Sequence, residues 1–192
     1  MKIYLSFDFD YLSDYDAFGE IQKVIDVPCT VFLIGDRHPP IKFPFKENVQ
    51  IGNHTYYHEN WESMLLGKRV EDLRVNHEFL RNMYGVECNV FRSPHLRRFD
   101  DTSDEMEKMG YKREMKCAIC TVCPPVGSQE YMQAFFSSHH ALSCPKDYLE
   151  NFEDICKQGN DFTFFLDPHR ETPERVKSLI EIGKKYGEWC YL

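Results

Sequence analysis

The sequence lacks long apolar runs, low-complexity tracts and Gly/Ser-rich linkers. None of its apolar stretches is long enough to span a bilayer, so we expect no stable membrane insertion. Residues 1–8 also lack the long apolar core and the small-residue cleavage site of a secretory signal, which favours a cytoplasmic protein. Because no linker divides the chain, we expect one domain over residues 1–192.

Positive charge is scarce as well. Lys and Arg together number 23 against 31 Asp and Glu, which gives a formal net charge of -8 with neutral histidines. This balance argues against a nucleic-acid or anionic-membrane partner, because both attract basic surfaces. The 8 cysteines are spread along the chain without an export signal, so reduced thiols are expected rather than a disulfide scaffold.

Short apolar segments with alternating or β-branched residues predict strands. In the first of them, residues 3–10, apolar and polar residues alternate strictly, and Asp8 and Asp10 fall on the same face. The polar end of this segment is therefore an acidic strand end. Further strands are predicted over residues 29–34, 49–51, 89–92, 117–122 and 162–166.

Helical patterns separate these strands. Gly85 is placed to end one helix, and Thr102 with Glu105 has the spacing of a capping box at the start of another. Strands that alternate with helices predict an α/β fold in which parallel strands are joined by helical crossovers, as an open sheet or a barrel. The predicted helices cover residues 70–84, 102–109 and 149–156 and a last segment that opens at 172–173.

Two pairs of polar residues stand at strand ends, where ligand sites of α/β folds collect. The carboxylates of Asp8 and Asp10 point to the same side of their strand, although the acids of an isolated Asp-x-Asp pattern more often lie in a solvated turn. His54 and His58 suit one divalent metal, provided that a helical turn follows their strand. One carboxylate with two imidazoles leaves positions open for water and substrate, as a catalytic metal site needs.

These residues resemble the motifs of the polysaccharide deacetylases, also called the NodB-homology or family 4 carbohydrate esterase group. Ser6-Phe-Asp8 is similar to the Thr-Phe-Asp-Asp motif, with the second acid displaced to Asp10 by Phe9. The segment His54-Thr-Tyr-Tyr-His58 matches the motif His-(Ser/Thr)-x-x-His in full. The first two motifs of the family thus coincide with the two strand ends described above.

The later motifs follow in the same order. Arg92-Ser-Pro94-His95 is similar to Arg-x-Pro-(Tyr/Phe), with histidine in place of the aromatic residue. Asp167-Pro-His169 resembles Leu-x-His, with aspartate where the family has leucine. A remaining motif, an Asp-Trp that orients the arginine or the acid histidine, has no convincing counterpart. Asp147 is a weak candidate for it.

The resemblance implies a distorted (β/α) barrel of about seven strands and a role for each matched residue. Phe9 leaves open which of Asp8 and Asp10 is the base and which is the metal ligand. In the family order, the metal ligands are Asp10, His54 and His58. Asp8 is the base, Arg92 holds it in place, and His169 is the acid. The backbone N–H of His95, which follows Pro94, stabilises the oxyanion.

The function implied is removal of an N-acyl group, most simply N-acetyl, from an amino sugar or sugar conjugate by metal-activated water. Zinc is the default for mixed imidazole and carboxylate ligands, with iron, cobalt, nickel or manganese as alternatives. The competing hypotheses are a catalytically silent carbohydrate-binding homologue and a hydrolase of other C–N bonds.

A second group of residues invites a different interpretation. Cys117, Cys120 and Cys123 have the spacing of a thiolate metal or iron–sulfur segment, with Cys144 as the nearest fourth partner. Buried structural thiols are the favoured interpretation. The pair His139-His140 is expected in a solvated loop, His38 in a turn among prolines and His77 on a helix face.

Overall fold

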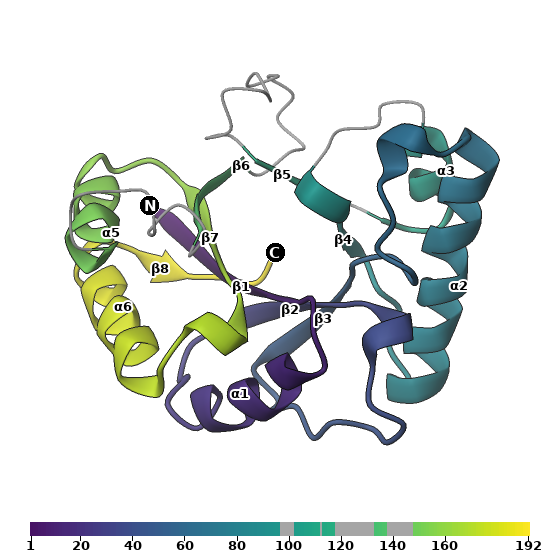
Figure 1. The fold of residues 1–192 in the computed structure, drawn as a ribbon. Helices are drawn as coiled ribbons and strands as arrows, with labels where there is room; N and C mark the ends of the chain where they lie inside the picture. The colour runs from purple at the N-terminus through teal and green to yellow at the C-terminus, as the bar shows by residue number, and fades with distance from the viewer. Residues whose placement is uncertain (97–101, 112, 118–132, 138–147) are drawn as a thin grey trace. The chain divides into compact units, whose positions relative to one another are not determined.

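The computed structural model describes residues 1–96, 102–111, 113–117, 133–137 and 148–192, and helices alternate with strands along these ranges (Figure 1). The chain divides into two compact units. Unit 1 comprises Met1–Val31, Pro44–Gln50 and Ala134–Leu192, and unit 2 comprises Phe32–Phe43 and Ile51–Gln133. The strands β2 (Cys29–Leu33) and β3 (Val49–Asn53) contain points where the chain passes from one unit to the other.

Unit 1 is organised around β1 (Lys2–Phe9). This strand pairs in parallel with β7 (Phe162–Leu166) and β8 (Glu188–Trp189), and β6 (Gln133–Ser137) pairs in parallel with β7. The other elements of this unit are the helices α1 (Ser13–Ile21), α5 (Tyr148–Lys157) and α6 (Pro173–Tyr186) and the 3-10 turn η5 (Pro168–Arg170).

The core of unit 1 lies on both faces of β1, because every residue from 3 to 9 is buried. Alternation predicted the strand, but a parallel strand covered on both faces also buries its polar positions. Asp8 is therefore only 5% exposed. On one side, Phe18 of α1 meets Phe7 and Phe9 edge to face, with ring centroids 5.0 and 5.2 Å apart.

Unit 2 contains the parallel strands β4 (Val90–Arg92) and β5 (Arg113–Cys117), and the end of β3 joins β4 where Asn53 lies opposite Phe91. A longer helix, α2 (Leu66–Tyr84), buries one face that includes Leu73, Asn76 and Leu80. The remaining elements are α3 (Ser103–Lys108) and the 3-10 turns η1 (Gly35–Arg37), η2 (Trp61–Ser63) and η3 (Pro94–Leu96).

The helix ends largely follow the sequence signals. Gly85 has a positive φ of 71° and its N–H bonds to the carbonyl of Arg81, so it ends α2 as predicted. Thr172 caps α6 by accepting a hydrogen bond from the N–H of Arg175. The capping box at Thr102 was wrong in detail, because this side chain makes no capping hydrogen bond and lies against the sulfur of Met106.

Among the described helices, none combines the length and the apolar composition that crossing a membrane requires.

Candidate active site

The predicted site residues all lie in the described ranges, at or just beyond strand ends. In unit 1, Asp8 is on β1, Asp10 follows it, and His169 is in η5 after β7. In unit 2, the histidines follow β3, Arg92 ends β4, and η3 begins at the next residue but one. The members of unit 2 are His54, His58, Arg92, Pro94 and His95.

In unit 2, His54 is held in a defined orientation. Its side chain is buried, and Nδ1 lies 2.7 Å from the carbonyl oxygen of Arg92. A carbonyl accepts only, so Nδ1 carries the proton and donates it. The lone pair is then on Nε2. A metal-binding imidazole needs this neutral tautomer, because the unprotonated nitrogen is the one that coordinates the ion. The ring of His58 is beside it, with centroids 4.8 Å apart.

The backbone between the two histidines is not the helical turn on which the spacing argument depended. Thr55 and His58 have positive φ angles of 66° and 55°, and the N–H of His58 donates to Oγ1 of Thr55 at 3.0 Å. Left-handed conformations of such residues cost about 1–2 kcal/mol each and persist where the surroundings enforce them. The rings are therefore brought together by a strained loop.

A third strained residue lies in the Arg-x-Pro-x motif. His95 has a φ of 57°, and its ring centroid is 5.1 Å from that of His58. Arg92 is fully buried, with its guanidinium 4.1 Å from the ring centroid of Phe32, a cation–π arrangement. Unit 2 thus brings together His54, His58, Arg92 and His95.

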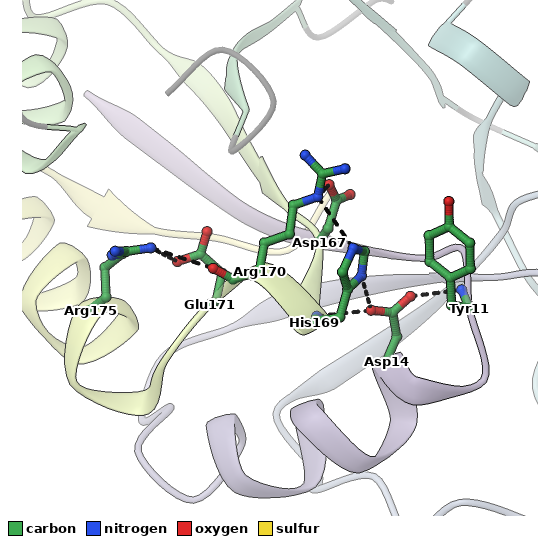
Figure 2. Close-up of polar contacts among 7 residues, drawn as sticks. All are labelled: Tyr11, Asp14, Asp167, His169, Arg170, Glu171 and Arg175. Carbon is green, nitrogen blue, oxygen red and sulfur yellow. Dashed lines mark hydrogen bonds and ion pairs between the residues drawn. The ribbon is translucent and has the colours of Figure 1, made fainter. Parts of the chain in front are cut away.

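In unit 1, His169 is paired with an acid that the sequence analysis did not single out (Figure 2). Oδ1 of Asp14 accepts from Nδ1 of His169 at 2.6 Å and from its backbone N–H at 2.9 Å. Oδ2 accepts from the N–H of Tyr11 at 2.8 Å. The Asp14 side chain is fully buried, while that of His169 is 25% exposed. No local signal in the sequence links two residues 155 positions apart.

The departure from the family motif at Asp167 has a visible consequence (Figure 2). Asp167 is buried and pairs with Nε of Arg170 at 3.3 Å, and this Nε also donates to Nε2 of His169 at 3.2 Å. His169 is therefore held with Nδ1 protonated towards Asp14 and Nε2 accepting from Arg170. Nε2 thus carries a lone pair, and it can deliver a proton to another group only after Arg170 has moved and Nε2 has itself been protonated.

The remaining candidates fall elsewhere. His38, expected in a turn, is half-buried, and its Nε2 bonds to the hydroxyl of Tyr84. Burial lowers the pKa of His38. His77 is on α2 as expected, with its Nδ1 2.8 Å from the hydroxyl of Tyr111. Cys117 ends β5. Outside the described residues lie Cys120, Cys123, His139, His140, Cys144 and Asp147.

The sequence matches the family model described as polysaccharide deacetylase over residues 1–113. This match covers more than half of the 192 residues, and the chain belongs to that family. The expectation drawn from the motifs is therefore confirmed at the level of the family. No curated protein matches the chain by sequence.

Solved structures of this family share the fold. The chitin deacetylase of Colletotrichum lindemuthianum is 16% identical with a TM-score of 0.68, covering 99% of this chain and 84% of its own. An acetyl xylan esterase of Clostridium thermocellum, solved with a cobalt ion, is 15% identical with a TM-score of 0.63, covering 100% and 88%. The predicted (β/α) barrel of the NodB type is thereby confirmed as the fold class, with eight strands in the described residues.

A third structure of the same fold is a family 4 pseudoenzyme of Bacillus anthracis. It is 13% identical with a TM-score of 0.67, and the match covers 98% of this chain but 62% of the pseudoenzyme. The chain thus spans less than two thirds of that protein's length. At such identities the likeness concerns the fold alone.

Proposed function

We propose that this protein is a metal-dependent hydrolase that removes an N-acyl group, in the first instance N-acetyl, from an amino sugar or sugar conjugate. The observation that carries the proposal is the orientation of His54, whose Nδ1 is bonded to the Arg92 carbonyl while its ring lies beside His58. Membership of the polysaccharide deacetylase family supplies the substrate class.

The proposed ligands are Asp10, His54 and His58, which together offer one carboxylate and two imidazoles. This donor set suits zinc and leaves coordination positions for water and substrate. Cobalt, iron, nickel and manganese accept the same donors. The fixed tautomer of His54 fits the requirement that a ligating imidazole be neutral.

A bound divalent cation would supply Lewis acidity, which brings the pKa of a water molecule towards neutrality. Asp8, only 5% exposed, is the proposed base that accepts the proton of the attacking water. Arg92 would hold that base. The backbone N–H of His95 would donate to the oxygen on which negative charge develops, a contribution of about 3 kcal/mol.

His169 is the proposed acid, which first gains a proton on Nε2 from solvent and then passes it to the departing amine. Asp14 would act on it as a positioning residue, because two hydrogen bonds to one carboxylate oxygen fix both the backbone and the ring. This carboxylate takes the orienting role for which the sequence offered no convincing residue. Arg170 would leave Nε2 when substrate enters, and the partial exposure of its side chain, 32%, allows that movement.

The decisive test is turnover of N-acetylated amino sugars by the metal-loaded protein and by Asp8→Asn. Removal of a general base is expected to lower kcat about 10²–10⁴-fold. Asp16→Asn, at an exposed position of α1, is the matched control and should leave kcat unchanged. Equal turnover by Asp8→Asn and the parent protein would contradict the mechanism.

One observation favours a catalytically silent homologue as the second candidate. Nε2 of His169 is the nitrogen from which an acid would deliver its proton, and it already accepts a hydrogen bond from Arg170. In that case the protein binds N-acetylated sugars without turnover. Arg170→Met separates the two candidates, because it uncovers Nε2 and should create activity only in a silent parent. Activity of the parent protein excludes this candidate.

A further inference from the structure

A buried carboxylate on α2 reaches the loop that carries the two histidines. Asp72 is only 3% exposed. Its Oδ1 accepts from the backbone N–H groups of Tyr56 and Tyr57, both at 2.9 Å, and its Oδ2 accepts from Nε1 of Trp61 at 3.0 Å. Tyr56 and Tyr57 are the two residues in the middle of the His54–His58 loop. One side chain thus holds the centre of this loop through its backbone.

The two ends of the loop are held in a similar way. The N–H of Thr55 donates to Oδ1 of Asn53 at 2.8 Å, and that oxygen also accepts from Nδ2 of Asn76 on α2 at 2.8 Å. The N–H of His58 donates to Oγ1 of Thr55 at 3.0 Å. Each backbone N–H from residue 55 to residue 58 therefore bonds to a side-chain oxygen.

Asn53 is itself fixed in orientation. Its Nδ2 donates to the hydroxyl of Tyr111 at 2.7 Å and to the carbonyl of Leu73 at 3.0 Å. Burial raises the pKa of Tyr111, so the hydroxyl remains protonated and can be oriented by its neighbours. The support of the loop consequently extends through α2 to Tyr111, which lies beyond α3.

These contacts explain how two positive φ angles persist in one short segment. A loop with free N–H groups would relax to ordinary backbone angles and carry its imidazoles apart. Charge-assisted hydrogen bonds to a buried carboxylate are stronger than neutral ones, and the carboxylate oxygens fix the positions of the N–H groups that bond to them. Asp72 thereby keeps the rings of His54 and His58 at their separation of 4.8 Å before any ion arrives.

We infer that Asp72 is a positioning residue for metal binding, which pre-organises His54 and His58 without itself touching the ion. This inference rests on the proposed function, because it takes these histidines as ligands. Residues that orient metal ligands typically contribute about 10–100-fold to metal affinity. Asp72→Asn keeps the size of the side chain but removes its charge and replaces one acceptor oxygen with an NH2 donor, which faces either the two backbone N–H groups or Nε1 of Trp61.

The experiment measures the affinity of the metal-free full chain for Zn²⁺ by competition with a chromophoric chelator. We expect Asp72→Asn to bind about 10–100-fold more weakly than the parent. The Co²⁺ absorption spectrum, which reports ligand geometry, should change in the same variant. Glu71→Gln is the matched control, since it removes an equal charge from an exposed neighbouring position of α2 and should leave both readouts unchanged.

The thermal midpoint of each metal-free variant separates positioning from general stability. A lower midpoint with unchanged Zn²⁺ affinity and Co²⁺ spectrum would overturn the inference. Trp61→Phe provides a second variant should Asp72→Asn not fold, because it removes the donor to Oδ2, keeps a buried aromatic ring and leaves Asp72 in place. It should weaken Zn²⁺ binding by a smaller factor, and an unchanged affinity there would also overturn the inference. A parent protein that binds no divalent ion would instead overturn the proposed function.

Discussion

At the scale of single residues, the imidazole of His169 has both ring nitrogens engaged. Nδ1 bonds to Asp14 and Nε2 to Arg170. The motif Asp167-Pro-His169 identified the histidine, but neither partner was predicted. Arg170 is adjacent in the sequence, whereas Asp14 is on a helix 155 positions away and is found only through the fold. Residue types at motif positions are readable from a sequence, and their hydrogen-bond partners generally are not.

The acid role of His169 predicts a dependence on the leaving group. His169→Ala should lower hydrolysis of N-acetyl amino sugars about 10²–10⁴-fold, because an amine leaves only when protonated. Hydrolysis of 4-nitrophenyl acetate, whose leaving group needs no proton, should change far less. Steady-state rates on both substrates provide the measurement. An equal loss on both would show that His169 does not act as the acid.

Asp14→Asn should lower kcat on the amide substrate about 10–100-fold with little change in KM. The asparagine oxygen can still accept the backbone N–H of His169, so η5 is retained while the charge behind the ring is lost. Asp14→Glu, which restores the charge, should recover part of the activity. A rise in KM with normal kcat would contradict a positioning role.

The cysteines differ in reactivity according to burial. Burial raises the pKa of Cys29, Cys88 and Cys156 to about 12 in each case. At pH 8 these thiols are therefore protonated, and the thiolate is the reactive form. Cys190 is half-buried. Alkylation of native protein followed by peptide mass spectrometry should modify Cys190 well before the three buried thiols, and denaturation should abolish the difference.

At the scale of elements, the sequence signals located most strands and helices of the described residues. The apolar spacing over 70–84 found α2, although the helix begins four residues earlier, at Leu66. The helix α1 and the strands β5, β6 and β8 were not predicted, and residues 118–122 of the strand predicted over 117–122 lie outside the described residues. The helix α1 (Ser13–Ile21) contains a glycine and has no side-chain cap, and its buried apolar residues are few, namely Tyr15, Phe18 and Ile21. Its packing against β1 and η5 compensates for weak local signals.

Gly67, in the first turn of α2, and Gly85, which ends this helix, provide a paired test of backbone energetics. Gly85→Ala places a side chain on a residue with φ of 71°, where nothing crowds the new Cβ, so the cost is conformational. We expect a loss of about 1 kcal/mol in the free energy of unfolding. Gly67→Ala, inside the helix and equally uncrowded, should increase it by about 0.5–1 kcal/mol. Urea denaturation measures both, and shifts of the same sign would contradict the argument.

At the scale of the whole molecule, the fold class was predictable because the family motifs occur in order at strand ends. The prediction of one domain over residues 1–192 stays a prediction beside the two compact units. The strained loop from His54 to His58 was not predictable, since its geometry depends on Asn53 and on Asp72 of α2. The spacing of four residues predicted that the two rings lie side by side, which they do, but it assumed a helical turn that this backbone does not form.

The proposed metal should stabilise the folded chain as a whole. A ligand that binds only the folded state adds about 2.7 kcal/mol to the free energy of unfolding at a concentration of 100 Kd. Calorimetric scans of chelator-treated protein, with and without added Zn²⁺, should therefore show a higher thermal midpoint with the ion. His58→Ala should abolish this increase while the metal-free midpoint changes little. An increase that survives in His58→Ala would place the ion elsewhere.

The pairing of β1 with β7 and β8 has a consequence for synthesis of the chain. Lys2 and Asp161, whose hydrogen bond lies beside the start of this pairing, are 159 positions apart. At about 5–20 residues per second, β1 leaves the ribosome roughly 10–30 s before these partners exist. During that interval a strand rich in apolar side chains lacks two of its neighbours, which creates a hazard of intermolecular association. Association of nascent chains through β1 is then expected to compete with folding of this protein.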